Sequence, residues 1–192
     1  MKKILAMLLA LVMVLSLAAC ASTQPAAEPA ASSDAPAESG KTYAVGVCQL
    51  VQHEALDAAT QGFVDALKEA LGDAVTIDVQ NASGDSVNCG TIVNGFVAKG
   101  VDLIMANATP ALTAAVSATA DIPILGTSIT AYGVALDIDD FSGTVGGNVS
   151  GTSDLADLQK QAQMILDWFP ETKTVGLLFC SAEPNSRYQI GE

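Results

Sequence analysis

Short apolar runs alternate with longer segments of helical spacing through the middle of the chain. The runs predict four buried strands, over Tyr43–Leu50, Ala74–Val79, Val101–Ala106 and Ile122–Leu125. Apolar residues that recur every three or four positions predict three helices between them, over residues 54–71, 86–99 and 109–119. This alternation predicts an α/β fold, in which a parallel sheet is flanked by helices.

Local signals set the expected ends of these helices. Gly72 and Gly100 follow the first two helices as stop signals. For the third helix, Thr109 is expected as the N-cap and Pro110 as the first helical residue. After Gly126 the pattern fades, and residues 127–152 are rich in Gly, Ser, Thr and Asp with a strand-like piece at Gly133–Ile138.

A second, shorter α/β pattern follows. Helical spacing returns over residues 155–169, and Thr174–Cys180 (TVGLLFC) reads as another buried strand. Ser181–Glu192 reads as a loop, with a helix as the alternative. Because one helix and one strand cannot bury their own apolar faces, we expect residues 153–192 to begin a second lobe. The expectation is that residues 42–152 form lobe one and that the chain is the N-terminal part of a longer protein.

The first residues carry an export pattern. Residues 1–19 combine two lysines with an apolar run that is short for a membrane span, which is typical of a signal peptide. Leu17-Ala18-Ala19-Cys20 resembles a bacterial lipobox, which predicts lipidation of Cys20 and anchoring to the outer face of the cell membrane. An ordinary signal with a coincidental cysteine is the alternative. Residues 20–41, rich in Ala, Ser, Pro and Glu, predict a flexible tether.

Charge and cysteine content exclude several classes of protein. The chain has 21 acidic and 8 basic residues, a net charge of −13, and loss of residues 1–19 removes two lysines and no acid to give −15. Such an acidic chain lacks the basic stripe of a nucleic-acid-binding protein. Four cysteines are too few for a disulfide scaffold, and Cys48, Cys89 and Cys180 are expected to be buried thiols in apolar patterns.

The segments that follow the predicted strands carry the candidate binding residues, because ligands of open parallel sheets bind beyond the carboxyl ends of the strands. These segments are short, polar and open onto helix N-termini, which favours a small polar ligand with a carboxylate. Singly, each residue is explained as a cap or turn former. Together they predict a binding cleft, formed by residues 49–53, 81–85, 107–110, 127–130 and 181–186.

The sequence gives little support for a catalytic or cofactor site. His53 is the only histidine, so a multi-histidine metal site is excluded, and it is expected to begin the first helix or to line the rim. No G-x-S-x-G nucleophile motif and no G-x-G-x-x-G after the first strand are present. We therefore expect no catalytic residue, metal or cofactor.

The same segments resemble one protein family in order along the chain. Gln49–Asp57 (QLVQHEALD) resembles the family's opening QLVEHPALD, and residues 81–85, 108–111, 147–154 and 183–186 continue its pattern. The chain is thereby similar to the N-terminal part of an ABC-transporter substrate-binding lipoprotein of the tryptophan/tyrosine type. Thr127–Gly133 departs from this pattern because it lacks the TDP that is usual in the family.

The resemblance implies a type I periplasmic-binding fold and an extracytoplasmic protein that delivers an amino acid, aromatic in some relatives, to an ABC permease and ATPase. It implies no nucleic-acid partner and no membrane contact besides the lipid anchor. The alternatives are a ligand-sensing domain and an α/β enzyme. The expected ligand-binding residues are Gln49, Leu50, His53, Asn81, Asp85, Thr109, Pro110, Thr127, Ser128, Ser153, Asp154, Glu183, Asn185 and Ser186.

Overall fold

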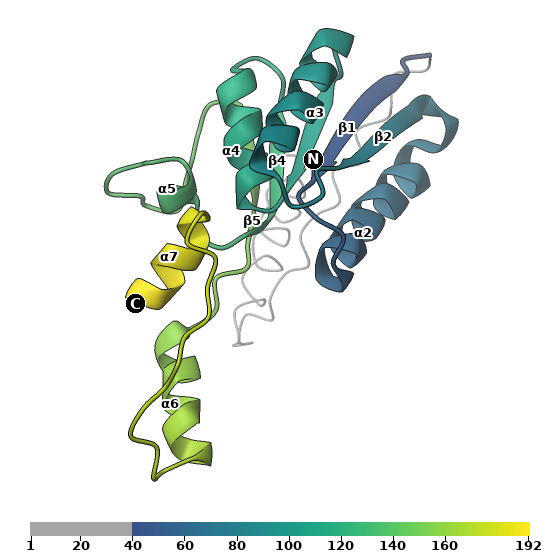
Figure 1. Ribbon diagram of the computed structural model, residues 1–192. Coiled ribbons are helices and arrows are strands. Elements are labelled where there is room, and N and C mark those ends of the chain that lie inside the picture. Colours follow the sequence, from purple (N-terminus) through teal and green to yellow (C-terminus); the bar gives the residue numbers. More distant parts are fainter. Residues whose placement is uncertain (1–39) are drawn as a thin grey trace, which may run out of the picture. The chain divides into compact units, whose positions relative to one another are not determined.

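A parallel five-stranded sheet is the centre of the computed structural model, which describes residues 40–192 (Figure 1). The predicted signal segment, Cys20 and most of the tether lie outside the described residues. The strand order is β2-β1-β3-β4-β5, and every neighbouring pair is parallel. The strands are β1 (Tyr43–Gln49), β2 (Val75–Asn81), β3 (Leu103–Asn107), β4 (Ile124–Ile129) and β5 (Val149–Ser153). The predicted α/β fold is confirmed.

Six helices are described within residues 40–192, and three of them pack on the sheet. They are α2 (Glu54–Leu71), α3 (Ser86–Lys99), α4 (Thr109–Ala118), α5 (Tyr132–Ala135), α6 (Leu158–Trp168) and α7 (Pro184–Gly191), with a short 3₁₀ turn η1 at Gly72–Ala74. Of these, α2 packs on one face of the sheet, and α3 and α4 pack on the other. Because neighbouring strand residues point to opposite faces, the two layers can be assigned from the side chains. Cys48, Ile104 and Ile124 face the core under α3 and α4, whereas Gln49 and Asn107 contact α2 on the other face.

The core under α3 and α4 is tightly packed. Phe96 of α3 is fully buried and lies directly over Gly46 of β1. A Cβ atom at Gly46 would come within 2.5 Å of the Phe96 ring, so only glycine allows this close approach of helix and strand. The packing fixes α3 against the strand that carries the first predicted binding segment.

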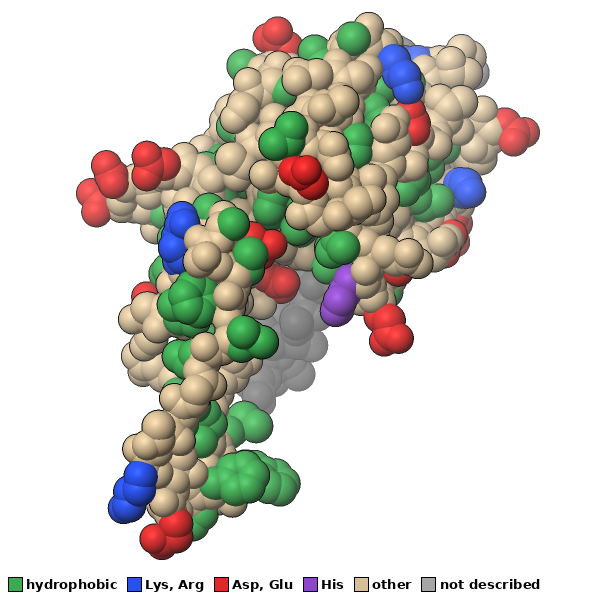
Figure 2. Space-filling view, in the orientation of Figure 1, with side chains coloured by type: hydrophobic (Ala, Val, Ile, Leu, Met, Phe, Trp, Pro, Cys, Tyr) green, Lys and Arg blue, Asp and Glu red, His purple; other side chains and the backbone are tan. Residues whose placement is uncertain are grey.

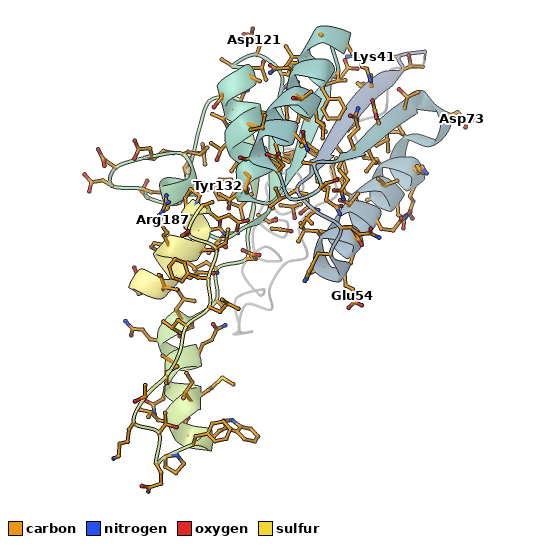
Figure 3. All side chains as sticks on the ribbon, viewed as in Figure 1. Lys41, Glu54, Asp73, Asp121, Tyr132 and Arg187 are labelled. Carbon is orange, nitrogen blue, oxygen red and sulfur yellow. The ribbon has the colours of Figure 1, made fainter. Side chains whose placement is uncertain are left out.

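The strand order contains a topological switch point between β1 and β3. The connection from β1 leads to α2 on one face, and the connection from β3 leads to α4 on the other face. The chain directions diverge between β1 and β3, and this switch point is where α/β folds bind ligands. Figure 3 marks the two edges of the sheet, with Lys41, Asp73 and Asp121 near the amino ends of the strands and Glu54 near the carboxyl ends.

Several boundaries in the region up to residue 153 differ from the sequence-based predictions. Thr127 and Ser128 lie within β4 rather than after it, because β4 continues to Ile129 through an irregularity in its pairing with β5. Ala108, not Thr109, is the N-cap of α4, so Pro110 is its second residue. The predicted strand-like piece at Gly133–Ile138 is wrong, since its first residues belong to α5.

The predicted buried strand at Thr174–Cys180 is also wrong. Residues 174–180 have no regular secondary structure, and Leu178 and Cys180 are exposed. A strand is stabilised by backbone hydrogen bonds to a neighbour, and no strand of the described chain pairs with this segment. Apolar composition alone therefore did not make it a strand, and the expectation that Cys180 is buried fails for the same reason.

The two helices of the last segment bury little surface. Neither α6 nor α7 contains a buried residue, although the predicted helix over residues 155–169 is largely confirmed as α6. α7 contacts α5, and Figure 2 shows hydrophobic side chains exposed over the segment that includes α6. Among residues 40–192, no helix has the length and apolar character that a membrane span requires.

Candidate functional site

A row of polar residues lies at the carboxyl edge of the sheet. The strand pairing places Asn81 opposite Gln49, Gln49 opposite Asn107, and Asn107 opposite Thr127. Four neighbouring strands therefore contribute one amide or hydroxyl side chain each at the same level. Asn107 belongs to the predicted cleft segment 107–110, although it was not among the expected ligand-binding residues.

The middle of this row belongs to a buried hydrogen-bond network that reaches α2. Asn107 Nδ2 donates to the Leu56 carbonyl at 2.8 Å and to Thr60 Oγ1 at 2.9 Å. Thr60 Oγ1 in turn donates to Gln49 Oε1 at 2.6 Å. Gln49 Nε2 donates to the Val51 carbonyl at 2.9 Å and to an Asp57 carboxylate oxygen at 2.5 Å. The network ties the ends of β1 and β3 to the first turns of α2.

This network fixes the orientation of the Asn107 amide. The Leu56 carbonyl can only accept a hydrogen bond, so the Asn107 nitrogen must face it. The Asn107 oxygen is then buried without a partner among the described residues. Gln49 uses both of its amide hydrogens and is itself buried, which gives it a positioning role for the Gln49–His53 segment.

The predicted loop residues cap the helices at this edge. His53 is the N-cap of α2, and its Nδ1 accepts from the Ala55 N–H, so the proton of the neutral ring lies on Nε2. Asp85 is the N-cap of α3 and accepts from the Val87 N–H at 2.8 Å. Asn81 Oδ1 accepts from the Ser83 N–H at 2.8 Å and closes the turn before that cap. These contacts explain why the predicted residues are short and polar.

The N-terminus of α4 differs from those of α2 and α3. Its N-cap Ala108 has φ 89° and ψ 156°, a conformation that residues other than glycine rarely adopt, and its side chain offers no capping group. Thr109 is buried and Pro110 is half-buried at the start of the helix. The first N–H groups of α4 therefore lack a side-chain cap, at the switch point between β1 and β3.

The strands β4 and β5 bring the next set of predicted residues to the same edge. Thr152 Oγ1 donates to Thr127 Oγ1 at 3.5 Å, and Ser128 has a left-handed φ of 56°. Ser153 Oγ donates to the Thr130 carbonyl at 2.9 Å, which places Asp154 just beyond the end of β5. Thr127 also lines a groove of 310 Å³ beside α2, together with apolar residues of α2, β3 and β4.

Tyr132 of α5 closes the far side of this edge. Its hydroxyl donates to the Gly126 carbonyl at 3.0 Å and, more weakly, to the Thr152 carbonyl at 3.3 Å. Burial, and to a smaller extent the Asp154 carboxylate, raises the pKa of Tyr132 to about 12. The phenol therefore stays protonated at neutral pH and acts as a clamp between β4 and β5.

The last group of predicted binding residues lies on α7 and the turn before it. Ser186 Oγ donates to a Glu183 carboxylate oxygen at 3.5 Å, and Asn185 Oδ1 is buried without a partner in the described chain. Pro184 lines a groove of 420 Å³ that runs along α3 and α4, from Ser86 and Pro110 as far as Ala118. Pro184 thus lies against the α3–α4 layer, and the place of Glu183, Asn185 and Ser186 on the binding rim stays a prediction.

Comparisons with known proteins identify relatives of this chain. The family model for "ABC transporter substrate binding protein" matches residues 44–192. A curated relative from Clostridioides difficile, named "Tyrosine-binding protein", is 36% identical over 98% of this chain and 55% of its own length.

Two solved structures are also similar. One, of an ABC domain in complex with L-Trp from Streptococcus pneumoniae, is 37% identical with a TM-score of 0.73 and covers 79% of this chain and 52% of that one. The other, a conserved domain protein from Vibrio cholerae, is 33% identical with the same TM-score and the same coverage. The chain spans about half the length of the relatives that it matches.

Proposed function

Because the chain belongs to the ABC transporter substrate binding protein family, we propose that it captures an amino acid for an importer outside the cytoplasm. In this proposal residues 42–152 form the first lobe of a two-lobed binding protein, and residues 153–192 begin the second. The ligand binds between the lobes without chemical change and is delivered to a permease driven by an ATPase. Closure of two lobes around a ligand is a common hinge motion.

The observation that carries the proposal is the polar row at the carboxyl edge of the sheet. It lies at the switch point of a fold shared with relatives whose names report tyrosine and L-Trp as ligands. We therefore propose an aromatic amino acid as the ligand class. The grooves beside α2 and beside α3 and α4 are partly apolar, which suits a ligand with a ring.

The charged ends of an amino acid suggest roles for the edge residues. The uncapped first turn of α4, with Thr109 at its start, suits the ligand carboxylate, since helix N–H groups favour an anion. The carboxylates of Asp85 and Asp154 suit the ligand ammonium group, and Asn81, His53 and Ser128 complete the polar rim. Gln49 and Leu50 are buried and support this rim from beneath.

Export and anchoring complete the proposal. We propose that residues 1–19 are removed and that Cys20 receives a lipid, so that the tether holds the binding lobes beside the membrane. Cys20→Ala is expected to leave the precursor uncleaved and without lipid. Radiolabelled lipid on that variant would contradict this part of the proposal.

A hybrid protein tests the ligand class. Residues 40–192 of this chain replace the matching half of the Clostridioides difficile relative, and cooperative melting confirms that the hybrid is folded. We expect calorimetry to detect binding of L-Tyr or L-Trp. A folded hybrid that binds none of the twenty standard amino acids would overturn the proposal.

Matched variants of the hybrid test the site. Asp85→Ala removes a proposed ammonium contact, and loss of a charged hydrogen bond of about 1.5–3 kcal/mol weakens affinity roughly tenfold or more. Asp73→Ala removes the same group at the opposite edge of the sheet and is expected to leave affinity unchanged. Equal effects of the two substitutions would contradict the proposed location.

A further inference from the structure

Two cysteines meet in the core beside the proposed site. Cys48 is the residue before Gln49 near the end of β1, and Cys89 lies in the first turn of α3. Both side chains are fully buried in the same apolar cluster, and α3 packs against β1. Neither residue has a role in the polar row or in its hydrogen-bond network.

Phe96 of α3 lies over Gly46 of β1. Cys89, two helical turns before Phe96, and Cys48, two residues after Gly46, lie on the same facing sides, so the two thiols meet in this cluster. This contact, together with burial, raises the pKa of the Cys48 thiol far above its ordinary value. The same contact lowers the pKa of Cys89.

We propose that Cys48 and Cys89 form a disulfide bond when the chain folds in an oxidising compartment. Two buried thiols that face each other from a helix and a strand that pack together have the arrangement that a disulfide requires. Cys180, the third cysteine of the described chain, is exposed on the segment after α6 and stays outside this pair. The inference depends on the proposed export for its oxidant, whereas the test below does not.

The chemistry is thiol–disulfide exchange with a disulfide-bearing oxidant, such as oxidised glutathione or a dithiol oxidase. The Cys89 thiolate attacks one sulfur of the oxidant, which forms a mixed disulfide and releases the other sulfur as a thiolate. The Cys48 thiolate then attacks Cys89 Sγ, and the second sulfur of the oxidant leaves. Two protein thiols are oxidised, one disulfide of the oxidant is reduced to two thiols, and the two protons pass to those thiols.

The complete burial of both sulfurs determines when this can happen. An oxidant cannot reach them in the folded chain, so the bond forms during folding and is then protected from reducing agents. The bond would join the strand that ends at Gln49 to the helix that begins after Asp85. It would thereby hold two of the proposed binding segments in a fixed relation.

Trypsin separates the cysteines cleanly, which makes the test direct. Cleavage after Lys41, Lys68, Lys99, Lys173 and Arg187 leaves Cys48, Cys89 and Cys180 on the three peptides 42–68, 69–99 and 174–187. The full chain is denatured, reduced, refolded with reduced and oxidised glutathione, alkylated and digested. We expect peptides 42–68 and 69–99 to appear as one linked species, two hydrogens lighter than their sum, and peptide 174–187 to be alkylated.

Matched variants and a melting curve complete the test. Cys180→Ser is expected to retain the linked species, and Cys89→Ala to lose it. Oxidised wild type is expected to melt roughly 5–10 °C above the reduced protein, a comparison that needs no substitution. Alkylation of both 42–68 and 69–99 after oxidising refolding, or linkage of either peptide to 174–187, would overturn the proposal.

Discussion

Two regions of the chain carry similar sequence patterns and differ in structure. Residues 43–49 (YAVGVCQ) form the buried strand β1, whereas residues 174–180 (TVGLLFC) form no strand, and Leu178 is fully exposed. The first segment lies between two strands and under helices on both faces. The difference teaches that an apolar run becomes a strand only where partners supply hydrogen bonds and cover its side chains.

Removal of one aromatic ring in each region should give the largest difference in stability between the two regions. Phe96 is fully buried under α3, and Phe179 is 42% exposed. Phe96→Ala is expected to lower the free energy of unfolding by about 3–5 kcal/mol, because it leaves a cavity against Gly46. Phe179→Ala is the matched control and should leave the urea midpoint within error. Comparable losses would show that residues 174–180 are packed after all.

The buried network under the polar row should give the next largest effect. Asn107→Leu leaves the Leu56 carbonyl and Thr60 without their donor, at an expected cost of about 1–3 kcal/mol of unfolding free energy. Asn94→Leu, at an exposed position of α3, serves as the control. Urea unfolding measures both, and a neutral Asn107→Leu would show that the network does not stabilise the junction of β1, β3 and α2.

Equivalent helix caps provide a sharper comparison of the two regions. Asp85 caps α3 through the Val87 N–H, and Asp157 caps α6 through the Lys160 N–H at 3.0 Å. Asp85→Ala should cost about 1 kcal/mol of unfolding free energy, because α3 belongs to the cooperative core. Asp157→Ala should reduce the helix content seen by circular dichroism without a shift of the urea midpoint. A midpoint shift for Asp157→Ala would place α6 in the same cooperative unit.

The smallest effect is expected at a surface ion pair. Lys99 Nζ lies 2.6 Å from Asp78 Oδ2, and this contact lowers the pKa of Asp78 below its ordinary value against a smaller opposing effect of burial. A lowered pKa means that the contribution is present at neutral pH and is lost as the pH falls through the lowered value. Because both groups are well exposed, the contribution is about 0–1 kcal/mol.

Its measurement compares the wild type with Asp78→Asn in urea across pH. The difference in stability should be greatest at neutral pH and should shrink on the acid side of the ordinary Asp pKa. Asp73→Asn, which changes an exposed carboxylate outside the two ion pairs of the described chain, is the control. A stability difference that grows as the pH falls would contradict a stabilising role of the ionised Asp78 carboxylate.

The sequence predicted most of the sheet because its signals were local. Apolar runs and helical spacing identified β1, α2, α3 and β3 to within a few residues. β5 was missed because VSGTS has few apolar side chains and is held by pairing with β4, which the sequence does not display. Thr174–Cys180 was wrongly predicted as a strand, because an apolar run forms a buried strand only where a neighbouring strand pairs with it.

The candidate site was predicted in outline rather than in detail. The segments that begin at Gln49, Asn81 and Asn107 lie at one edge as predicted, because parallel topology brings them there, whereas residues 181–186 follow no strand. Gln49 pairs with Asn107, and both side chains are hydrogen-bonded to Thr60. Gln49 and Asn107 are far apart in sequence, so no local pattern predicted these contacts. The assignment of Gln49 as a direct ligand contact stays a prediction, and its buried network favours a positioning role.

Hydrogen exchange by mass spectrometry tests the central comparison most directly, in the chain alone and in the hybrid with a relative's second half. In the chain alone, amides of β1, β3 and β4 are expected to exchange only with global unfolding, and residues 174–180 to exchange at nearly unprotected rates. In the hybrid, residues 174–180 should become protected as their strand partners are supplied. Strong protection of residues 174–180 in the chain alone would contradict the account.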